Sequence, residues 1–157
     1  MEVNKRTGWR SEIRIIARDL KGNIIDDVTL KNQIKNVGLN LMRDGLSGAA
    51  SSTEIKYLAW GSSNTANAVN QTALVAEFGR KQITSQEAGS TGVVTTTCYI
   101  APNEGNRTKI EELGWFAGSG ATAIANSGVL VARVLYSRTK SALESLQVIR
   151  TDTFTEV

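Results

Sequence analysis

Adjacent carboxylates are the first residues of this 157-residue chain whose chemistry would suggest catalysis. Asp26-Asp27 and Glu111-Glu112 each place two acids side by side, and paired carboxylates often carry out general acid–base catalysis. Both pairs lie in stretches with the pattern of strands, where neighbouring side chains point to opposite faces of the sheet. The two acids of a pair therefore cannot share a substrate, and we expect no catalytic role for them.

Other parts of known catalytic and ligand-binding sites are incomplete in the sequence. The chain has no histidine and one cysteine, Cys98, so the usual zinc ligand sets and the common base of nucleophilic catalysis are missing. The loop Gly118-Ser119-Gly120 resembles a phosphate cradle, but no Lys-Ser or Lys-Thr pair follows at the required spacing. We predict that the protein is not an enzyme and has no catalytic, cofactor-binding or metal-binding residues.

Aromatic and basic side chains suggest contacts with other proteins instead. Large aromatic residues in strands, such as Trp60 and Trp115, serve either the core or a subunit interface. The basic residues near Trp9 suit an N-terminal arm that anchors in a neighbouring subunit, and a chain end without contacts is the alternative. The predicted assembly contacts are Lys5, Arg6, Trp9, Arg10, Trp60 and Trp115.

Composition limits the other classes of partner. The net charge is only +3 and the basic residues are spread along the chain, so nucleic acid is not the expected partner. The longest apolar runs, such as residues 129–132, are far shorter than the roughly 20 residues that cross a bilayer. No apolar signal segment follows the charged N-terminus. We therefore expect no membrane contact and synthesis in a cytoplasm.

The order of the predicted elements indicates a mainly β protein. Ile13, Ile15 and Ala17 alternate with charged residues over residues 12–18, and residues 24–31 resume an extended pattern after a turn, which predicts a β-hairpin. Asn36 is predicted to cap a short helix that begins at Val37. Further strands are predicted at 55–60, 78–85, 93–100, 110–117, 129–136 and 143–154, with a hairpin joining 78–85 to 93–100, a helical turn at 72–76, and loops at 61–71 and 118–128.

About eight strands with turn signals roughly every ten residues are typical of a β-sandwich. The predicted fold is an antiparallel β-sandwich or barrel-like domain of about eight strands with one short helix. Residues 1–11 are predicted to form an N-terminal arm and residues 12–157 a single β-rich domain.

Several short segments resemble, in this order, the small structural proteins of tailed bacteriophages. The segments are residues 18–23 (RDLKGN), 31–40 (KNQIKNVGLN), 55–61 (IKYLAWG), 72–74 (TAL), 77–80 (EFGR), 109–116 (KIEELGWF) and 130–133 (LVAR). The resemblance spans about residues 12–155. Trp60 departs from the pattern, which has a smaller residue before the glycine.

The resemblance implies a non-enzymatic virion protein of the tail, fibre-associated or head-decoration type. Such a protein is assembled in the host bacterial cytoplasm, and its partners are copies of itself and other capsid, neck or tail proteins. Two other functions stay open. A carbohydrate-binding β-sandwich on the virion surface requires Trp60 or Trp115 to be exposed. A single-stranded nucleic-acid-binding domain would use Tyr57, Trp60 and Arg133 on an open sheet.

Overall fold

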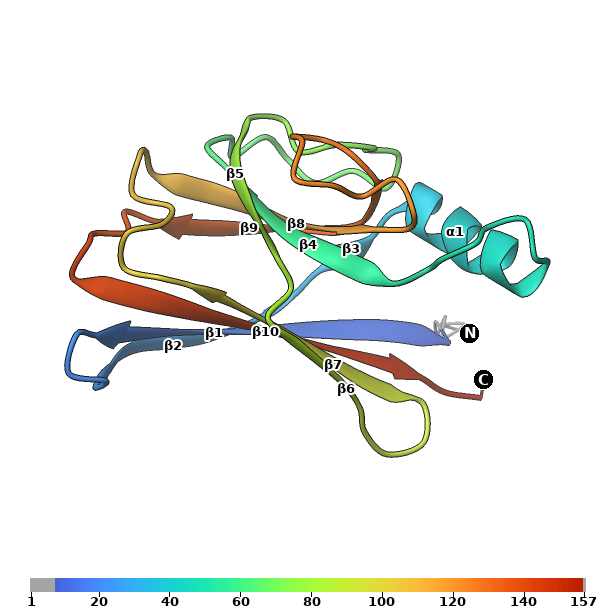
Figure 1. Ribbon diagram of the computed structural model, residues 1–157, viewed down its shortest axis with the longest axis horizontal. Coiled ribbons are helices and arrows are strands. Elements are labelled where there is room, and N and C mark those ends of the chain that lie inside the picture. Colours follow the sequence, from blue (N-terminus) through green and yellow to red (C-terminus); the bar gives the residue numbers. More distant parts are fainter. Residues whose placement is uncertain (1–7, 157) are drawn as a thin grey trace, which may run out of the picture.

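The computed structural model describes residues 8–156, which form two antiparallel five-stranded sheets stacked face to face (Figure 1). The first sheet has the strand order β2-β1-β10-β7-β6 and the second has the order β3-β9-β8-β4-β5. The predicted β-sandwich is confirmed. The elements are β1 (Trp9–Asp19), β2 (Ile24–Lys31), β3 (Gln33–Ile34), α1 (Asn36–Leu46), β4 (Ile55–Gly61), β5 (Glu77–Gln82), β6 (Ser85–Ala88), β7 (Val93–Ile100), β8 (Ile110–Ala117), β9 (Val129–Arg138) and β10 (Glu144–Phe154).

Strand β1 shows how the alternating pattern produces the sandwich. Ile13, Ile15 and Ala17 are buried between the sheets, because side chains of equal parity on a strand share one face. The predicted hairpin of β1 and β2 is confirmed by their antiparallel pairing. On its other side β1 pairs with β10 along its whole length, from Trp9 opposite Phe154 to Asp19 opposite Glu144.

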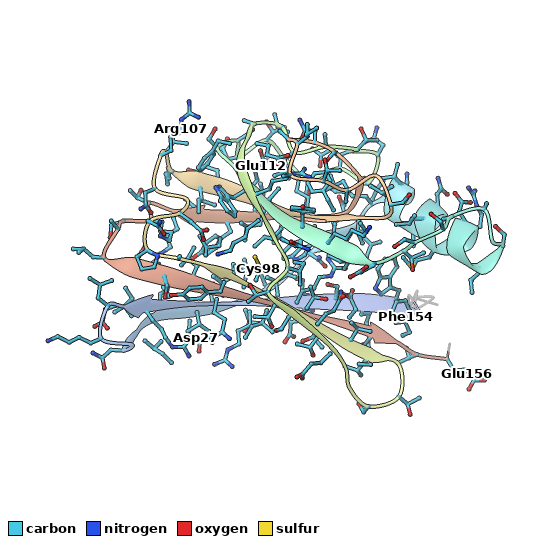
Figure 2. The ribbon with its side chains drawn as sticks, viewed as in Figure 1. Asp27, Cys98, Arg107, Glu112, Phe154 and Glu156 are labelled. Carbon is cyan, nitrogen blue, oxygen red and sulfur yellow. The ribbon has the colours of Figure 1, made fainter. Side chains whose placement is uncertain are left out.

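The core lies between the two sheets and contains both predicted strand tryptophans. Trp60 and Trp115 are 5% and 1% exposed. Cys98 lies in the same layer, as Figure 2 shows, and is a small core side chain as predicted. Burial raises the pKa of its thiol to about 11 because the thiolate is poorly solvated there.

The predicted strand 78–85 is wrong in one respect, because it is two strands in different sheets. β5 pairs with β4 in the second sheet, whereas β6 pairs with β7 in the first. The chain crosses between the sheets at Ile83 and Thr84. The alternating pattern continues across this crossing, which explains why the pattern alone did not show it.

Three smaller predictions also differ from the structure. Residues 9–11 belong to β1 rather than to an arm, because they pair with β10. Asn36 is the first residue of α1 and Lys35 is its N-cap, which makes no side-chain capping hydrogen bond. Residues 72–76 contain no helical turn. They lie in a loop over the outer face of the second sheet (Figure 1).

Candidate assembly site

The first sheet has an incomplete edge at the start of β1. Strand β2 pairs with β1 only from Glu12 to Arg18, because the chain leaves β2 after Lys31 and crosses to β3 in the second sheet. Residues 9–11 of β1 are therefore paired with β10 on one side and have no neighbouring strand on the other within residues 8–156.

The backbone of Trp9 faces this open side. In an antiparallel ladder each residue directs its N–H and C=O to the same side, and successive residues alternate. Gly8 O accepts a hydrogen bond of 3.0 Å from Thr155 N, on the β10 side. The next residue, Trp9, therefore directs both its N–H and its C=O toward the missing strand, and so does Ser11.

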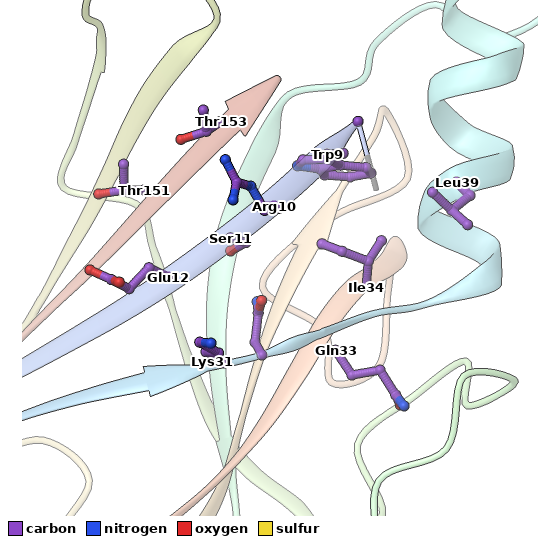
Figure 3. A pocket seen from close by; sticks show the side chains of 12 residues that line it. Trp9, Arg10, Ser11, Glu12, Lys31, Gln33, Ile34, Leu39, Thr151 and Thr153 are labelled. Atoms are coloured by element: carbon purple, nitrogen blue, oxygen red, sulfur yellow. The ribbon is translucent and has the colours of Figure 1, made fainter. Parts of the chain in front are cut away.

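A groove of about 820 Å³ lies along this open edge (Figure 3). Trp9, Ile34 and Leu39 provide apolar side chains from β1, β3 and α1, and Leu39 is 51% exposed. Such a combination of free backbone groups and apolar surface is typical of sites that receive an extended segment as an added strand.

The position of Trp9 is fixed by a buried ion pair beneath it. The Arg150 guanidinium donates two hydrogen bonds of 2.7 Å to the Asp152 carboxylate, which also accepts one of 2.8 Å from Trp9 Nε1. The Trp9 ring stacks on Phe154 with centroids 5.4 Å apart. Because its ring and its N–H both have partners, Trp9 offers the groove a preorganised wall.

Asn32 completes the end of the groove where β2 stops. With the side-chain amide assigned so that its oxygen faces Arg150, this oxygen accepts a hydrogen bond of 2.7 Å and the nitrogen lies 3.3 Å from Ser11 O. The Ser11 carbonyl therefore has a partner, and Trp9 remains the residue whose N–H and C=O both face the open edge.

The charged residues along the groove carry a small positive excess. Arg10, Glu12 and Lys31 line it. Glu12 and Lys31 are opposite one another on β1 and β2, and Arg10 lies one step further toward the open end of β1. An acidic side chain beside Arg10 would therefore meet two cations and one carboxylate.

A buried polar cluster holds the loop of residues 62–76 on the second sheet. The Glu112 carboxylate accepts hydrogen bonds from Arg133 Nε at 2.7 Å, Ala76 N at 2.8 Å and Val75 N at 3.2 Å. Arg133 also donates to the carbonyl oxygens of Thr65 and, at 3.4 Å, Ser63. Glu112 and Arg133 are fully buried, so this ion pair fixes the loop rather than presenting charge to a ligand.

Lys35 extends the same cluster at the start of α1. Its ammonium group lies 2.7–3.0 Å from four oxygen acceptors: Gln33 Oε1, Asn67 Oδ1, Ala68 O and Gln71 Oε1. Burial, and secondly the nearby charge of Arg133, lower the pKa of Lys35 to about 8. Lys35 thus connects the helix start, β3 and the loop.

The loop of residues 118–128 is held in a similar way by Arg80. Its guanidinium forms an ion pair with Glu77 at 2.6 Å and donates to Thr122 O and Ser127 O at 2.9 and 3.1 Å. It also lies 4.3 Å from the centroid of the Phe116 ring. Both long loops are therefore fixed parts of the scaffold, and the prediction of flexible excursions does not match these contacts.

The structure separates the six predicted contact residues. Trp9 and Arg10 line the groove, so the structure brings these two together. Trp60 and Trp115 are core residues, so the expectation that they make assembly contacts is wrong in this structure, since buried side chains cannot reach a partner. Lys5 and Arg6 lie outside the described residues.

Sequence reasoning missed Ile34 and Leu39, because the groove arises where β2 ends and no local pattern marks that point. The buried charges had a signal that was not used. Arg133 interrupts the apolar run 129–135, and Arg150 follows Val148-Ile149, so each is a charge within a core-facing pattern. Such residues are usually paired, as both are here.

Comparisons with family models, curated proteins and solved structures give no match to this chain. Among residues 8–156, no cluster of three or more His, Cys, Asp or Glu side chains is arranged to hold a metal ion. In the same part of the chain no helix has the length and apolar character to span a membrane.

Proposed function

We propose that this chain is a non-enzymatic structural component of a tailed-bacteriophage particle, as a capsid decoration, neck or tail adaptor. It acts through protein–protein assembly contacts with copies of itself and with other virion proteins, after assembly in the host bacterial cytoplasm. The resemblance of its segments to small phage structural proteins supports the class of particle.

The observation that carries the assembly role is the open edge of β1 in its apolar groove. Free backbone groups of Trp9 and the exposed side chain of Leu39 together offer main-chain hydrogen bonds and apolar contact to an added segment. Binding of this kind uses little side-chain specificity and much backbone geometry, which suits contacts repeated in an assembly.

A second apolar surface supports the adaptor role. Leu20 and Leu143 are 63% and 68% exposed at the end of the sandwich opposite the groove, next to the pair Asp19–Glu144 that closes the β1–β10 ladder. In Figure 1 the two chain ends and α1 lie at one end of the sheets and the β1–β2 turn lies at the other. A rigid domain with a contact surface at each end can join two neighbours.

No observation favours the two alternative functions. The carbohydrate-binding hypothesis required an exposed Trp60 or Trp115, and both are buried. The nucleic-acid hypothesis required Trp60 and Arg133 on an open sheet, and Arg133 is fully buried in an ion pair with Glu112.

The test is mass spectrometry and cryo-electron microscopy of purified particles whose genome encodes this chain. We expect the protein at a fixed copy number and its sandwich in a symmetric array in the head, neck or tail. Particles that lack the protein would overturn the proposal.

A further inference from the structure

We propose that the groove beside β1 receives the segment Met1-Glu2-Val3 of a second copy as an added strand. The inference deepens the proposed function and rests on it in one respect, namely that copies of the chain meet in an assembly. It follows from the free backbone groups, the distribution of apolar and charged side chains, and the sequence that leads into the groove.

The backbone determines where the added strand lies. A segment in line with β2 would be opposite residues 9–11 of β1, in the space that the chain vacates when it leaves β2 after Lys31. There it would pair with the N–H and C=O of Trp9, which face away from β10. Its length is limited to a few residues, because β2 occupies the edge from Glu12 onward.

The side chains determine which sequence fits. Trp9 and Ser11 share the face of β1 that carries the buried Ile13, so residues opposite them point toward the apolar side chains of the groove. The residue opposite Arg10 points to the other face, beside Arg10 and in line with Lys31. The groove therefore selects the alternation apolar, acidic, apolar.

This alternation occurs at Met1-Glu2-Val3. Within residues 8–156 it occurs once more, at Ala76-Glu77-Phe78, where the Glu77 carboxylate is buried in an ion pair with Arg80. The described part of a second copy therefore cannot supply the segment without breaking that ion pair, and residues 1–3 can.

The connection favours a second copy over the chain's own segment. Four residues, Asn4 to Thr7, join Val3 to Gly8, which itself lines the groove and is paired with Thr155. These four residues include neither glycine nor proline, the residues that favour a tight reversal. Extended, they span about 13 Å, so two grooves that face each other across a two-fold axis can exchange segments reciprocally.

The test uses two full-length charge reversals, Glu2→Lys and Arg10→Glu, with Glu87→Lys as the control. Glu87 is an exposed carboxylate on β6, at the opposite edge of the same sheet. Sedimentation equilibrium should show a wild-type dimer whose dissociation constant rises about tenfold in each reversal, because an attractive cross-strand pair becomes repulsive. Glu87→Lys should match the wild type.

Mixing the two reversed chains separates exchange between copies from a contact within one chain. In a mixed dimer each segment meets a groove of opposite charge, so the mixture should associate like the wild type. Wild-type protein that stays monomeric, reversals that associate normally, or a mixture that is not restored would each overturn the inference. Particles that contain the protein at a fixed copy number would leave the proposed function standing in any of these cases.

Discussion

Replacing Glu112 by glutamine should destabilise the protein strongly, because this carboxylate neutralises Arg133 and holds the loop of residues 62–76. Its Oε2 accepts from Arg133 Nε and Val75 N, and its Oε1 accepts from Ala76 N. An amide keeps one oxygen and presents an NH₂ group to the other donors. The variant therefore loses at least one hydrogen bond and leaves the Arg133 charge without its counter-ion.

The expected cost follows from the burial of both partners. Glu112 and Arg133 are each 0% exposed, and breaking one side of a buried ion pair costs about 3–5 kcal/mol. That is a large share of the roughly 5–15 kcal/mol by which domains are stable. The double variant Glu112→Leu/Arg133→Met should recover much of the loss, because it leaves no unpaired charge.

Urea unfolding followed by tryptophan fluorescence measures the effect, since Trp60 and Trp115 are buried in the folded state. Glu111→Gln is the matched control. Glu111 is the neighbouring residue on β8 and pairs at the surface with Lys109, so its replacement should leave the unfolding midpoint unchanged within error. Hydrogen exchange should also show faster exchange of the Val75 and Ala76 amides in the Glu112→Gln variant.

Equal midpoints for Glu112→Gln and Glu111→Gln would refute the reasoning that the buried pair stabilises the fold. A double variant no more stable than Glu112→Gln would refute the narrower point that the unpaired charge causes the loss. If Glu112→Gln does not fold at all, the double variant still decides between these explanations.

Three further results are expected. Gly38→Ala should destabilise by about 1–3 kcal/mol although alanine favours helices, because its Cβ would lie 2.8 Å from Val131 O; Gly120→Ala, with open space around it, should have little effect on the unfolding midpoint. Cys98 should resist a thiol reagent at pH 8 and react fully in urea, because burial raises its pKa to about 11; rapid labelling of the folded protein would contradict its core position. Burial lowers the pKa of Lys35 to about 8 from about 10.5 in the unfolded chain, so between these values only the unfolded chain is protonated and the free energy of unfolding should rise with pH. This is best measured in a Cys98→Ala background, because the thiol titrates in the same range with the opposite sign, and a flat or falling free energy there would contradict the burial of the ammonium.

The sequence predicted those parts of the fold whose signals are local. The alternation around Ile13 and Ile15 identified β1 and its buried face, the turn near Gly22 identified the first hairpin, and the limits of β8 agree with the prediction. A two-residue period depends only on which face is buried, so it can be read without knowing the neighbouring strand.

The predicted aromatic contacts failed for a physical reason. Trp60 and Trp115 have the same residue type and the same strand context whether the strand faces a core or a partner. Gly79 decides the matter for Trp60, because it has no side chain where the indole lies across β5. That complementarity joins β4 to β5 and appears only when the sheet order is known.

The sequence by itself determined that the chain is a β-sandwich with a short helix, because periodicity and turn residues act within a few positions. Tertiary structure alone decided that β2 ends three residues short of the start of β1, which opens the groove at Trp9. It also decided that Glu112 meets Arg133 and that Arg150 meets Asp152 beneath Trp9. The edge of a sheet depends on which strands pair and where the chain leaves them, and that is settled by packing between segments far apart in the sequence.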